Sequence, residues 1–409
     1  MKLGVRISLI VCFFLVLAGL VWVSSVQTVE LENEPVNNEK TEITVPTQES
    51  TRPPESATEA VKSAFTKAEL ENVDGIITDK LEEIDFNGTF LVAVGDEVIY
   101  HKAMGYSDKE NKKKNTLDTK YEIGSCSKQF TATAIAKLAE EKQLSIKDKV
   151  TKYVKDAKIA EDVTIEHLLN MCSGLPDYLN EYIYQLEAGE RDEDAEFSNK
   201  EFLNWLNKQE LVFEPGEYFS YSNTNYYLLG LIIEEVSGET YEEYIQNEIF
   251  YPLYMDDSSL KMTDTNCKGY LDNEWTEGIK VDSSYFYSAG EIVSTTSDML
   301  KWVNAYSRGK VLGNDMFKKA TNTGSDGFNY GFGWFVCDDY YYHTGNTELY
   351  YAIDMVTKED DIKVIGLSNI NNTELQPTGI SILFQVEEEL FPGKHNVQPT
   401  EPNEPTNKS

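Results

Sequence analysis

The order of hydrophobic patterns along the chain constrains its fold more than any other feature. Two β-rich runs separated by Gly95-Asp96 predict a hairpin, and a helical stretch ending near Glu83 precedes them. Apolar residues then recur at helical spacing, and β-rich runs return near the end. Strands, then helices, then strands favour one α+β domain whose sheet is completed by both chain ends, with a helical lobe inserted between them. The expected strands are 89–94, 97–103, 332–337, 340–343, 349–356 and 362–369, and the expected helices of the middle are 130–143, 164–171, 200–208 and 223–236.

Residues 1–26 are expected to direct export. Lys2 and Arg6 precede an apolar run over residues 7–23, and small residues follow at Ser24 and Ser25. A basic start followed by an apolar stretch is typical of a secretory signal peptide. Because the run approaches the ~20 residues that span a bilayer, an uncleaved membrane anchor is an equal alternative. Either form places the rest of the chain outside the cytosol, at the cell surface or secreted.

Two segments have a composition that does not favour packing. The stretch 27–64 is rich in Glu, Thr, Pro and Asn and contains no aromatic residue and no Gly, so it cannot bury enough apolar surface to order itself. We expect a tether over 27–65, one globular domain over 66–392 and a loose tail over 393–409. The net charge is −34, and phosphate backbones would repel such a chain, so we expect no nucleic-acid partner.

A serine and a lysine stand where a helical apolar period begins. Ser125 and Lys128 lie three residues apart, just before Phe130, and one helical turn brings their Cβ atoms to within ~5–6 Å. Serine is a weak nucleophile until a base takes its proton, and burial lowers the pKa of lysine toward neutrality. The spacing alone is weak, because Ser258 and Ser307 also have a lysine three residues on, in segments expected at the surface. An N-cap serine beside a solvated lysine is the alternative.

A second motif, Tyr221-Ser222-Asn223, follows the turn residues Pro215-Gly216 and precedes an apolar helix. Polar side chains on a loop that enters a buried helix can point into a cleft. The alternative is that Tyr221 packs in the core while Ser222 or Asn223 caps the helix, a position that both residue types prefer.

A third motif, His343-Thr344-Gly345, ends a tyrosine-rich run that predicts a strand. A glycine in a strand allows another backbone to approach closely. The alternative is an ordinary strand end. None of the three motifs identifies a site by itself.

Together and in this order, the three motifs resemble those of the serine β-lactamase and penicillin-binding-protein superfamily, in its class C-like branch. That branch also holds D-aminopeptidases, D,D-carboxypeptidases and esterases. The resemblance covers almost all of residues 86–369 and implies a β-lactamase/transpeptidase-like fold with an antiparallel sheet. Connecting segments share it as well, namely 105–106, 164–169, 173–178, 288–290, 294–295 and 331–334.

The resemblance implies a role for the residues of the first two motifs. Ser125 would be the acylated nucleophile, and Lys128 would be its base or the electrostatic partner of the base. Tyr221 would relay the proton to and from the leaving group. Whether the lysine or the tyrosine acts as the base stays open. Asn223 would hold the substrate amide.

The third motif would line the substrate-binding cleft. His343 stands where many relatives have a lysine, and Gly345 completes the triplet. Backbone N–H groups of Ser125 and Asn346 would form the oxyanion hole. Because histidine is mostly neutral near pH 7, His343 would attract a substrate carboxylate less than lysine does. If Glu348 faces the cleft, it would favour a cationic group, whereas a solvent-facing Glu348 would have no such effect.

We therefore expect an exported serine hydrolase that forms an acyl-enzyme on a cell-envelope peptide or ester, with a preference for a free amine over a β-lactam. A slowly deacylating penicillin sensor is the alternative. We expect no metal and no cofactor, because the four histidines are scattered. The chain has no Gly-x-Ser-x-Gly motif of the α/β-hydrolase type. Whether Cys126 pairs with Cys172 stays open.

Overall fold

The computed structural model describes residues 63–192, 195–279, 281–321 and 329–393. The predicted signal peptide or anchor, nearly all of the predicted tether, and the predicted tail beyond residue 393 lie outside these residues and stay predictions. Within the described part of the chain, no helix has the length and apolar character needed to cross a membrane.

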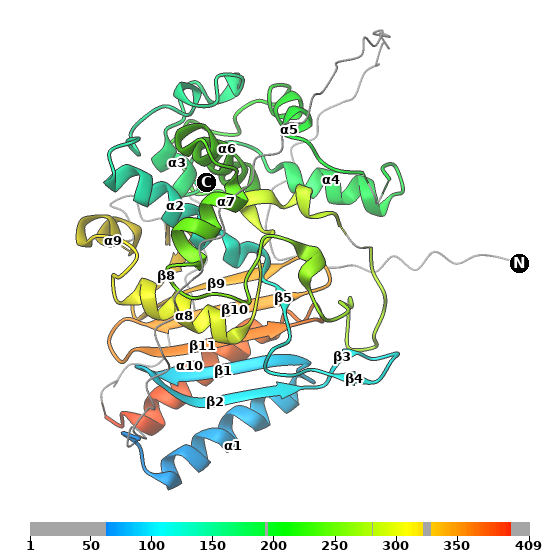
Figure 1. The fold of residues 1–409 in the computed structure, drawn as a ribbon, viewed down its shortest axis with the longest axis vertical. Coiled ribbons are helices and arrows are strands. Elements are labelled where there is room, and N and C mark those ends of the chain that lie inside the picture. Colours follow the sequence, from blue (N-terminus) through cyan, green and yellow to red (C-terminus); the bar gives the residue numbers. More distant parts are fainter. Residues whose placement is uncertain (1–62, 193–194, 280, 322–328, 394–409) are drawn as a thin grey trace, which may run out of the picture. The chain divides into compact units, whose positions relative to one another are not determined.

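Seven strands of the described residues form one antiparallel sheet (Figure 1), in the order β2-β1-β11-β10-β9-β8-β7. Strand β1 pairs with β11 along its whole length, from Gly88 opposite Ser368 to Val94 opposite Ile362. The two ends of the domain therefore share one sheet, and the predicted antiparallel α+β fold is confirmed. The strands are β1 (Gly88–Val94), β2 (Glu97–Met104), β7 (Tyr330–Gly331), β8 (Trp334–Val336), β9 (Tyr340–Asn346), β10 (Tyr351–Thr357) and β11 (Ile362–Ser368).

The predicted strand over 332–337 is wrong in one respect. A turn at Phe332-Gly333 divides it, so that β7 and β8 form a short hairpin. Both turn residues have a positive φ, +39° and +89°, which a strand cannot accommodate. A Cβ on Gly333 would lie 2.7 Å from the Cα atom of Gln129. The first turn of helix α2 (Lys128–Glu140) therefore approaches this hairpin so closely that position 333 requires glycine.

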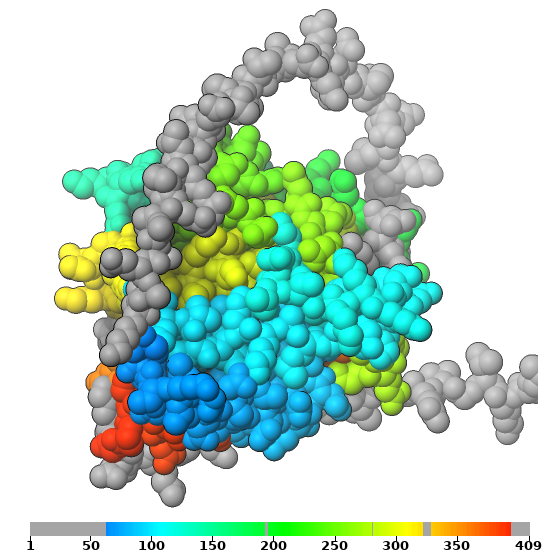
Figure 2. Space-filling view, turned by 60° about the horizontal axis from the view of Figure 1, so that its bottom comes forward, coloured from blue at the N-terminus to red at the C-terminus, as the bar shows by residue number. Residues whose placement is uncertain are grey.

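Helices α1 (Lys67–Glu83) and α10 (Leu375–Leu390) pack together and cover one face of the sheet (Figure 1). Figure 2 shows α1 in blue, beside the segment that follows the β1–β2 hairpin. Helix α10 was not predicted, because Pro377 and its β-branched residues have low helix propensity. Pro377 lies in the first turn of the helix, where the missing N–H costs little. Burial of the apolar face of α10 against the sheet stabilises the helix despite its low propensity. The core on this side includes Val73, Ile77, Leu81, Phe90, Ile382, Leu383 and Val386.

The other face of the sheet carries α8 and the predicted helical lobe, whose largest contact joins α2 to α6. Several of these helices were not predicted, namely α4, α7, α8 and α9. The helices are α2 (Lys128–Glu140), α3 (Ile165–Leu169), α4 (Tyr178–Glu187), α5 (Asn199–Leu206), α6 (Asn223–Ser237), α7 (Tyr241–Ile245), α8 (Thr296–Ser307) and α9 (Asn314–Thr321).

Short elements connect the lobe to the sheet. Two small sheets pair β3 (Tyr106–Asp108) with β4 (Lys113–Lys114) and β5 (Tyr121–Glu122) with β6 (Val293–Ser294). The cysteines of the described residues, Cys126, Cys172, Cys267 and Cys337, are free thiols, so Cys126 does not pair with Cys172. Single helical turns are η1 (Gly124–Ser127), η2 (Val150–Lys152), η3 (Lys158–Ala160), η4 (Gln246–Phe250), η5 (Met262–Asp264), η6 (Ser283–Tyr285) and η7 (Tyr287–Ala289).

Candidate active site

Ser125 lies in the turn η1, between the short strand β5 and the buried helix α2. It is half-buried, whereas its neighbours Gly124 and Cys126 are buried. Gly124 has φ +50°, and a Cβ there would lie 2.7 Å from the backbone nitrogen of Asn346. Glycine therefore lets the turn lie directly against β9, with the Ser125 hydroxyl partly accessible.

Lys128 is the first residue of α2 and is 0% exposed. Its Nζ contacts three oxygens, at 2.9 Å from Ser125 Oγ, 2.8 Å from Asn223 Oδ1 and 2.7 Å from the carbonyl oxygen of Ala289. The predicted meeting of the first two motifs is thus present. Asn223 Oδ1 and the Ala289 carbonyl oxygen can only accept hydrogen bonds, so each accepts one N–H of the Lys128 amine.

The hydrogen bond between Lys128 Nζ and Ser125 Oγ can then run in either direction. A charged amine donates to the Ser125 hydroxyl, whereas a neutral amine has its lone pair facing that hydroxyl and can accept its proton. Burial lowers the pKa of Lys128 from 10.5 to about 7, against the opposing charges of Asp177 and Cys126. The neutral, basic form is therefore abundant near pH 7.

Tyr221 hydrogen-bonds the Ser125 side chain from the opposite motif. Its ring lies 5.1 Å from Lys128 Nζ and stacks on Phe335 with centroids 6.3 Å apart. Burial raises the pKa of the Tyr221 hydroxyl, although the bond from Ser125 opposes this. Tyr221 is therefore a neutral phenol near pH 7, which suits a proton relay better than a standing base.

Asn223 links Lys128 to a carboxylate that was not among the predicted site residues. Its Oδ1 accepts from Lys128, and its Nδ2 donates to Asp177 Oδ2 over 2.9 Å. The alternative that Ser222 caps α6 with its side chain is wrong, because Ser222 makes no such bond. Asp177 instead caps α4 by accepting from the Leu179 N–H. A Pro-Asp pair before a helix was the available signal for an N-cap, but nothing local indicated its contact with Asn223.

His343 lies on β9 and is 1% exposed. Its Nδ1 is 2.6 Å from the Thr344 carbonyl oxygen, and its Nε2 is 3.1 Å from the Tyr330 hydroxyl. Because a carbonyl can only accept, Nδ1 carries the hydrogen and Nε2 accepts from Tyr330. Burial, followed by repulsion from Lys128, lowers the pKa of His343 to about 3. The imidazole is therefore neutral and cannot form an ion pair with a substrate carboxylate.

Gly345 is the position at which β9 meets the nucleophile turn. A Cβ there would lie 1.8 Å from the carbonyl oxygen of Ile123 and 3.0 Å from the Ser125 nitrogen, so no other residue fits without movement. Asn346 follows and is exposed. Its side-chain Nδ2 donates to Asn371 Oδ1 over 3.0 Å, which leaves its backbone as the part that faces the turn.

A buried carboxyl group lies beneath the turn. Asp354 of β10 stands opposite His343 in the sheet and accepts from Gln129 Nε2 at 2.8 and 2.7 Å. The Gln129 Oε1 in turn accepts from Trp302 Nε1 over 2.6 Å. Cys126 also hydrogen-bonds Asp354, and burial raises the pKa of that carboxyl from 3.8 to about 7. This network fixes η1 and α2 to the sheet.

Glu348 lies in the turn after β9, with φ +67°. It is half-buried rather than fully solvated. Burial raises the pKa of its carboxyl, and the charge of Glu187 raises it further. Glu187 ends α4, whose first residue follows Asp177. The charges of Glu348 and Glu187 therefore interact, and together they make the potential negative between the turn after β9 and the end of α4.

A profile of the Beta-lactamase family matches residues 73–386. The chain belongs to this family. Protein flp from Staphylococcus aureus (strain N315) is 30% identical over 332 residues, covering 75% of this chain and 64% of the relative. Putative penicillin-binding protein PbpX of Bacillus subtilis (strain 168) is 29% identical over 306 residues, covering 72% and 74%. The chain thus spans 64% of the length of the staphylococcal relatives that it matches.

Solved structures of the same fold include an octameric penicillin-binding protein homologue from Pyrococcus abyssi, with TM-score 0.67, 29% identity and coverage of 78% of this chain and 79% of that one. A D-amino acid amidase from Ochrobactrum anthropi SV3 has TM-score 0.66 at 23% identity, with coverage of 78% and 99%. The second likeness shows the fold alone. The superfamily resemblance is confirmed, and the class C-like branch stays a prediction.

Within this β-lactamase-family domain, the structure brings Ser125, Lys128, Tyr221 and Asn223 together. Their roles, and the substrate-binding roles of His343, Gly345 and Asn346, stay predictions. The other two Ser-x-x-Lys matches form no such site, because Lys261 and Lys310 are exposed. Among the described residues, no group of three or more His, Cys, Asp or Glu side chains is placed to hold a metal ion.

Proposed function

We propose that this protein is an exported serine hydrolase that forms an acyl-enzyme on Ser125 and acts on a cell-envelope amide or ester. One observation carries the proposal. A fully buried lysine, with a pKa lowered to about 7, has its third hydrogen-bonding position at the Ser125 hydroxyl. Such a group supplies the general base that a serine nucleophile requires. Export rests on residues 1–26, and cell fractionation with N-terminal sequencing tests both cleavage and anchoring.

The acylation step follows from these contacts. Ser125 Oγ bonds to the substrate carbonyl carbon as its proton moves to the neutral Lys128, and the carbonyl electron pair moves to oxygen. The backbone N–H groups of Ser125 and Asn346 are the proposed donors to this oxyanion. When the carbonyl re-forms, the bond to the leaving group breaks, and the leaving group takes a proton relayed through Tyr221. A water molecule then repeats the sequence and releases the acid.

The charges around the site favour a substrate with a free amine. His343 is neutral, so it does not attract the carboxylate of a β-lactam or a peptide C-terminus. Glu348 and Glu187 add negative charge at the turn after β9, which favours an ammonium group. We propose D-aminoacyl esters or amides as the substrate class.

Burst kinetics with p-nitrophenyl acetate test the nucleophile. The wild-type protein should release about one equivalent of p-nitrophenol before the steady state, and Ser125→Ala should release none. The slow phase then separates a hydrolase that turns over from a slowly deacylating sensor. Equal kinetics of the two proteins would refute Ser125 as the nucleophile.

Substrate preference is tested with D-alanyl p-nitroanilide and a chromogenic cephalosporin. The D-alanyl compound should give the larger kcat/KM. Glu348→Gln should lower that value several-fold while p-nitrophenyl acetate acylation stays unchanged. Glu374→Gln, an exposed carboxylate at the start of α10, is the matched control. Faster hydrolysis of the cephalosporin would contradict the proposed substrate class.

A further inference from the structure

Asp354 is a fully buried carboxyl group on β10 that takes no part in the proposed acylation step. It stands directly opposite His343 of β9, and opposite residues of an antiparallel pair point to the same face of the sheet. Gly345 shares this face, because it lies two residues after His343 on the same strand. A Cβ on Gly345 would meet the Ile123 carbonyl and the Ser125 nitrogen. The Asp354 side chain therefore points toward the turn that carries the nucleophile.

The Asp354 carboxyl group joins three segments that carry predicted site residues. Gln129 Nε2, in the first turn of α2, donates to its two oxygens over 2.8 and 2.7 Å. The Cys126 thiol in η1 and the backbone N–H of His343 in β9 also hydrogen-bond it. A carboxylate can accept about four hydrogen bonds. One side chain thus connects α2, η1 and β9.

The direction of the bond from Gln129 is fixed by Trp302 of α8. The indole Nε1 can only donate, and it donates to Gln129 Oε1 over 2.6 Å. The amide nitrogen of Gln129 must therefore face Asp354, whose oxygens accept from it. Trp302 is itself held in place by stacking on Phe130, with ring centroids 4.1 Å apart. The connection from α8 through α2 to β10 therefore has one defined orientation.

The two proposed oxyanion donors lie on segments that Asp354 connects. The N–H of Ser125 belongs to η1 and stands immediately before Cys126, whereas the N–H of Asn346 lies at the end of β9. Asn346 is paired with Tyr351 of β10, so the sheet fixes its position relative to Asp354. The bonds from Asp354 to η1 and α2 therefore set the separation between the two N–H groups.

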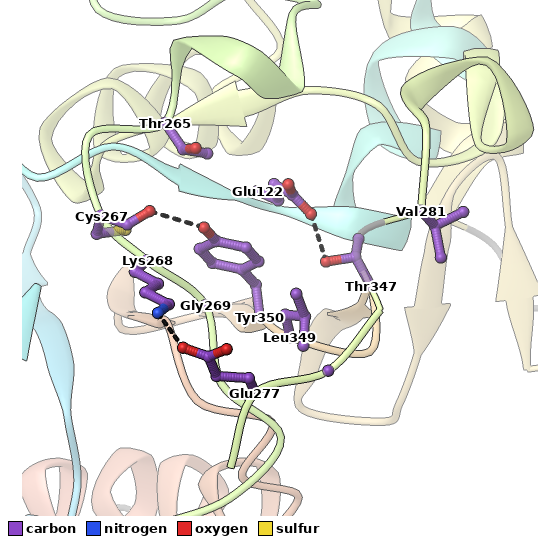
Figure 3. Close-up of a pocket in the computed structure, with 11 residues that line it drawn as sticks. Glu122, Thr265, Cys267, Lys268, Gly269, Glu277, Val281, Thr347, Leu349 and Tyr350 are labelled. Atoms are coloured by element: carbon purple, nitrogen blue, oxygen red, sulfur yellow. Dashed lines mark hydrogen bonds and ion pairs between the residues drawn. The ribbon is translucent and has the colours of Figure 1, made fainter. Parts of the chain in front are cut away.

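A second hydrogen bond joins the segments next to these donors. Thr347, the residue after Asn346, donates through Oγ1 to Glu122 Oε2 of β5 over 2.6 Å (Figure 3). This bond keeps β5 and the turn after β9 together when Asp354 is changed. Loss of the Asp354 contacts should therefore shift η1 without detaching it. Such a shift is sufficient to affect the reaction, because a misplacement of about 1 Å can cost about 10²-fold in rate.

We propose that Asp354 is a positioning residue for acylation, which holds η1 and the first turn of α2 against the sheet so that the N–H groups of Ser125 and Asn346 converge on the substrate oxygen. Asp354 does not touch the substrate and acts through Cys126 and Gln129. This inference rests on the proposed hydrolase function and adds to it the group that keeps the oxyanion donors in register.

The test compares acylation by p-nitrophenyl acetate with acylation by p-nitrophenyl thionoacetate, in which sulfur replaces the carbonyl oxygen. Sulfur accepts weaker hydrogen bonds than oxygen, so the thiono compound gains less from the two N–H groups. Both rates are measured by stopped flow at pH 8, where Lys128 and Asp354, each with a pKa of about 7, are mainly deprotonated. A loss of folded protein lowers both rates equally, whereas a displaced oxyanion donor lowers the ratio of the acetate rate to the thionoacetate rate.

Three variants change the connection itself. Cys126→Ala removes only the thiol that joins η1 to Asp354, and it should lower the rate ratio several-fold. Cys126→Ser supplies a hydroxyl donor at the same position and should retain the ratio of the wild type. Asp354→Asn keeps an acceptor for Gln129 but turns an N–H group toward the other donors, so it should lower the ratio roughly tenfold.

Asp298→Asn is the matched control. Asp298 is also buried, at 1% exposed, but its carboxyl group accepts from the Asp257 N–H over 2.9 Å. This variant should leave the rate ratio unchanged. Thermal unfolding of each variant confirms that it folds, and if Asp354→Asn does not fold, the two Cys126 variants decide the question.

Three results would overturn the proposal: an unchanged rate ratio in the folded Cys126→Ala and Asp354→Asn variants, an equal loss in Cys126→Ser and Cys126→Ala, or an equal loss in Asp298→Asn. The burst of the wild-type protein tests the proposed function separately. A missing burst would refute Ser125 as the nucleophile and this inference with it, whereas a full burst with unchanged ratios would refute this inference alone.

Discussion

The buried amine of Lys128 should give acylation a pH dependence with a midpoint near 7. Only the neutral amine can accept the Ser125 proton, so the acylation rate should rise with pH and reach a plateau above pH 8. With a pKa of about 7, about half of the lysine is neutral at pH 7. At the ordinary value of 10.5 about one molecule in three thousand would be neutral. Burial thus increases the basic form on the order of a thousandfold.

Asp177→Asn tests the cause of this value. The charge of Asp177 raises the Lys128 pKa, so its removal should move the midpoint to lower pH. Hydrogen bonds of 2.8 and 2.9 Å through the Asn223 amide place the two charges no more than about 8 Å apart. At an effective dielectric constant of about 20, this corresponds to roughly 2 kcal/mol, or about 1.5 pKa units.

The assay is stopped-flow acylation by p-nitrophenyl acetate between pH 5 and 9, read where both forms of p-nitrophenol absorb equally. Glu374→Gln is the control, because it removes an exposed carboxylate on the opposite face of the sheet. A flat profile, or a midpoint near that of free lysine, would refute Lys128 as the base. A midpoint raised by Asp177→Asn would refute the electrostatic reasoning.

Four further substitutions have defined outcomes. Gly345→Ala places a Cβ 1.8 Å from the Ile123 carbonyl oxygen and should cost about 1–3 kcal/mol of stability in urea unfolding. Gly75→Ala in α1, where nothing lies within 4 Å, should instead stabilise by up to about 1 kcal/mol. Tyr221→Phe should slow acylation roughly 10²–10⁴-fold, and an unchanged rate would exclude the relay. The folded pKa of Asp354 is about 7 against 3.8, so its folded state retains a proton that the unfolded chain loses. Its contribution to stability should therefore fall from pH 4 to pH 7, by up to about 4 kcal/mol, and Asp354→Asn should remove that slope from unfolding measured against pH.

Several features could be predicted from the sequence because their causes are local. The β1–β2 hairpin follows from two β-rich runs around Gly95-Asp96, and both strands lie as expected. The meeting of Ser125 and Lys128 follows from one helical turn, and their hydrogen bond confirms it. The order of strands and helices likewise indicated an α+β fold with a sheet shared by both chain ends.

Other features depend on contacts between distant segments. Asp177 reaches the site only through Asn223, and the helix α10 is stabilised by burial against the sheet. His343 is neutral because β9 buries it beside Tyr330 and Lys128. The burial of a side chain is set by everything that packs around it, so its pKa cannot be deduced from its neighbours in sequence.

The sequence by itself determined which residues could do chemistry and in what order they occur. Only the tertiary structure decided their states, namely a lysine whose pKa is near 7 and an uncharged histidine. The physical reason is that helical turns and hairpins act over a few residues, whereas desolvation and hydrogen-bond partners depend on segments that meet only in the folded chain.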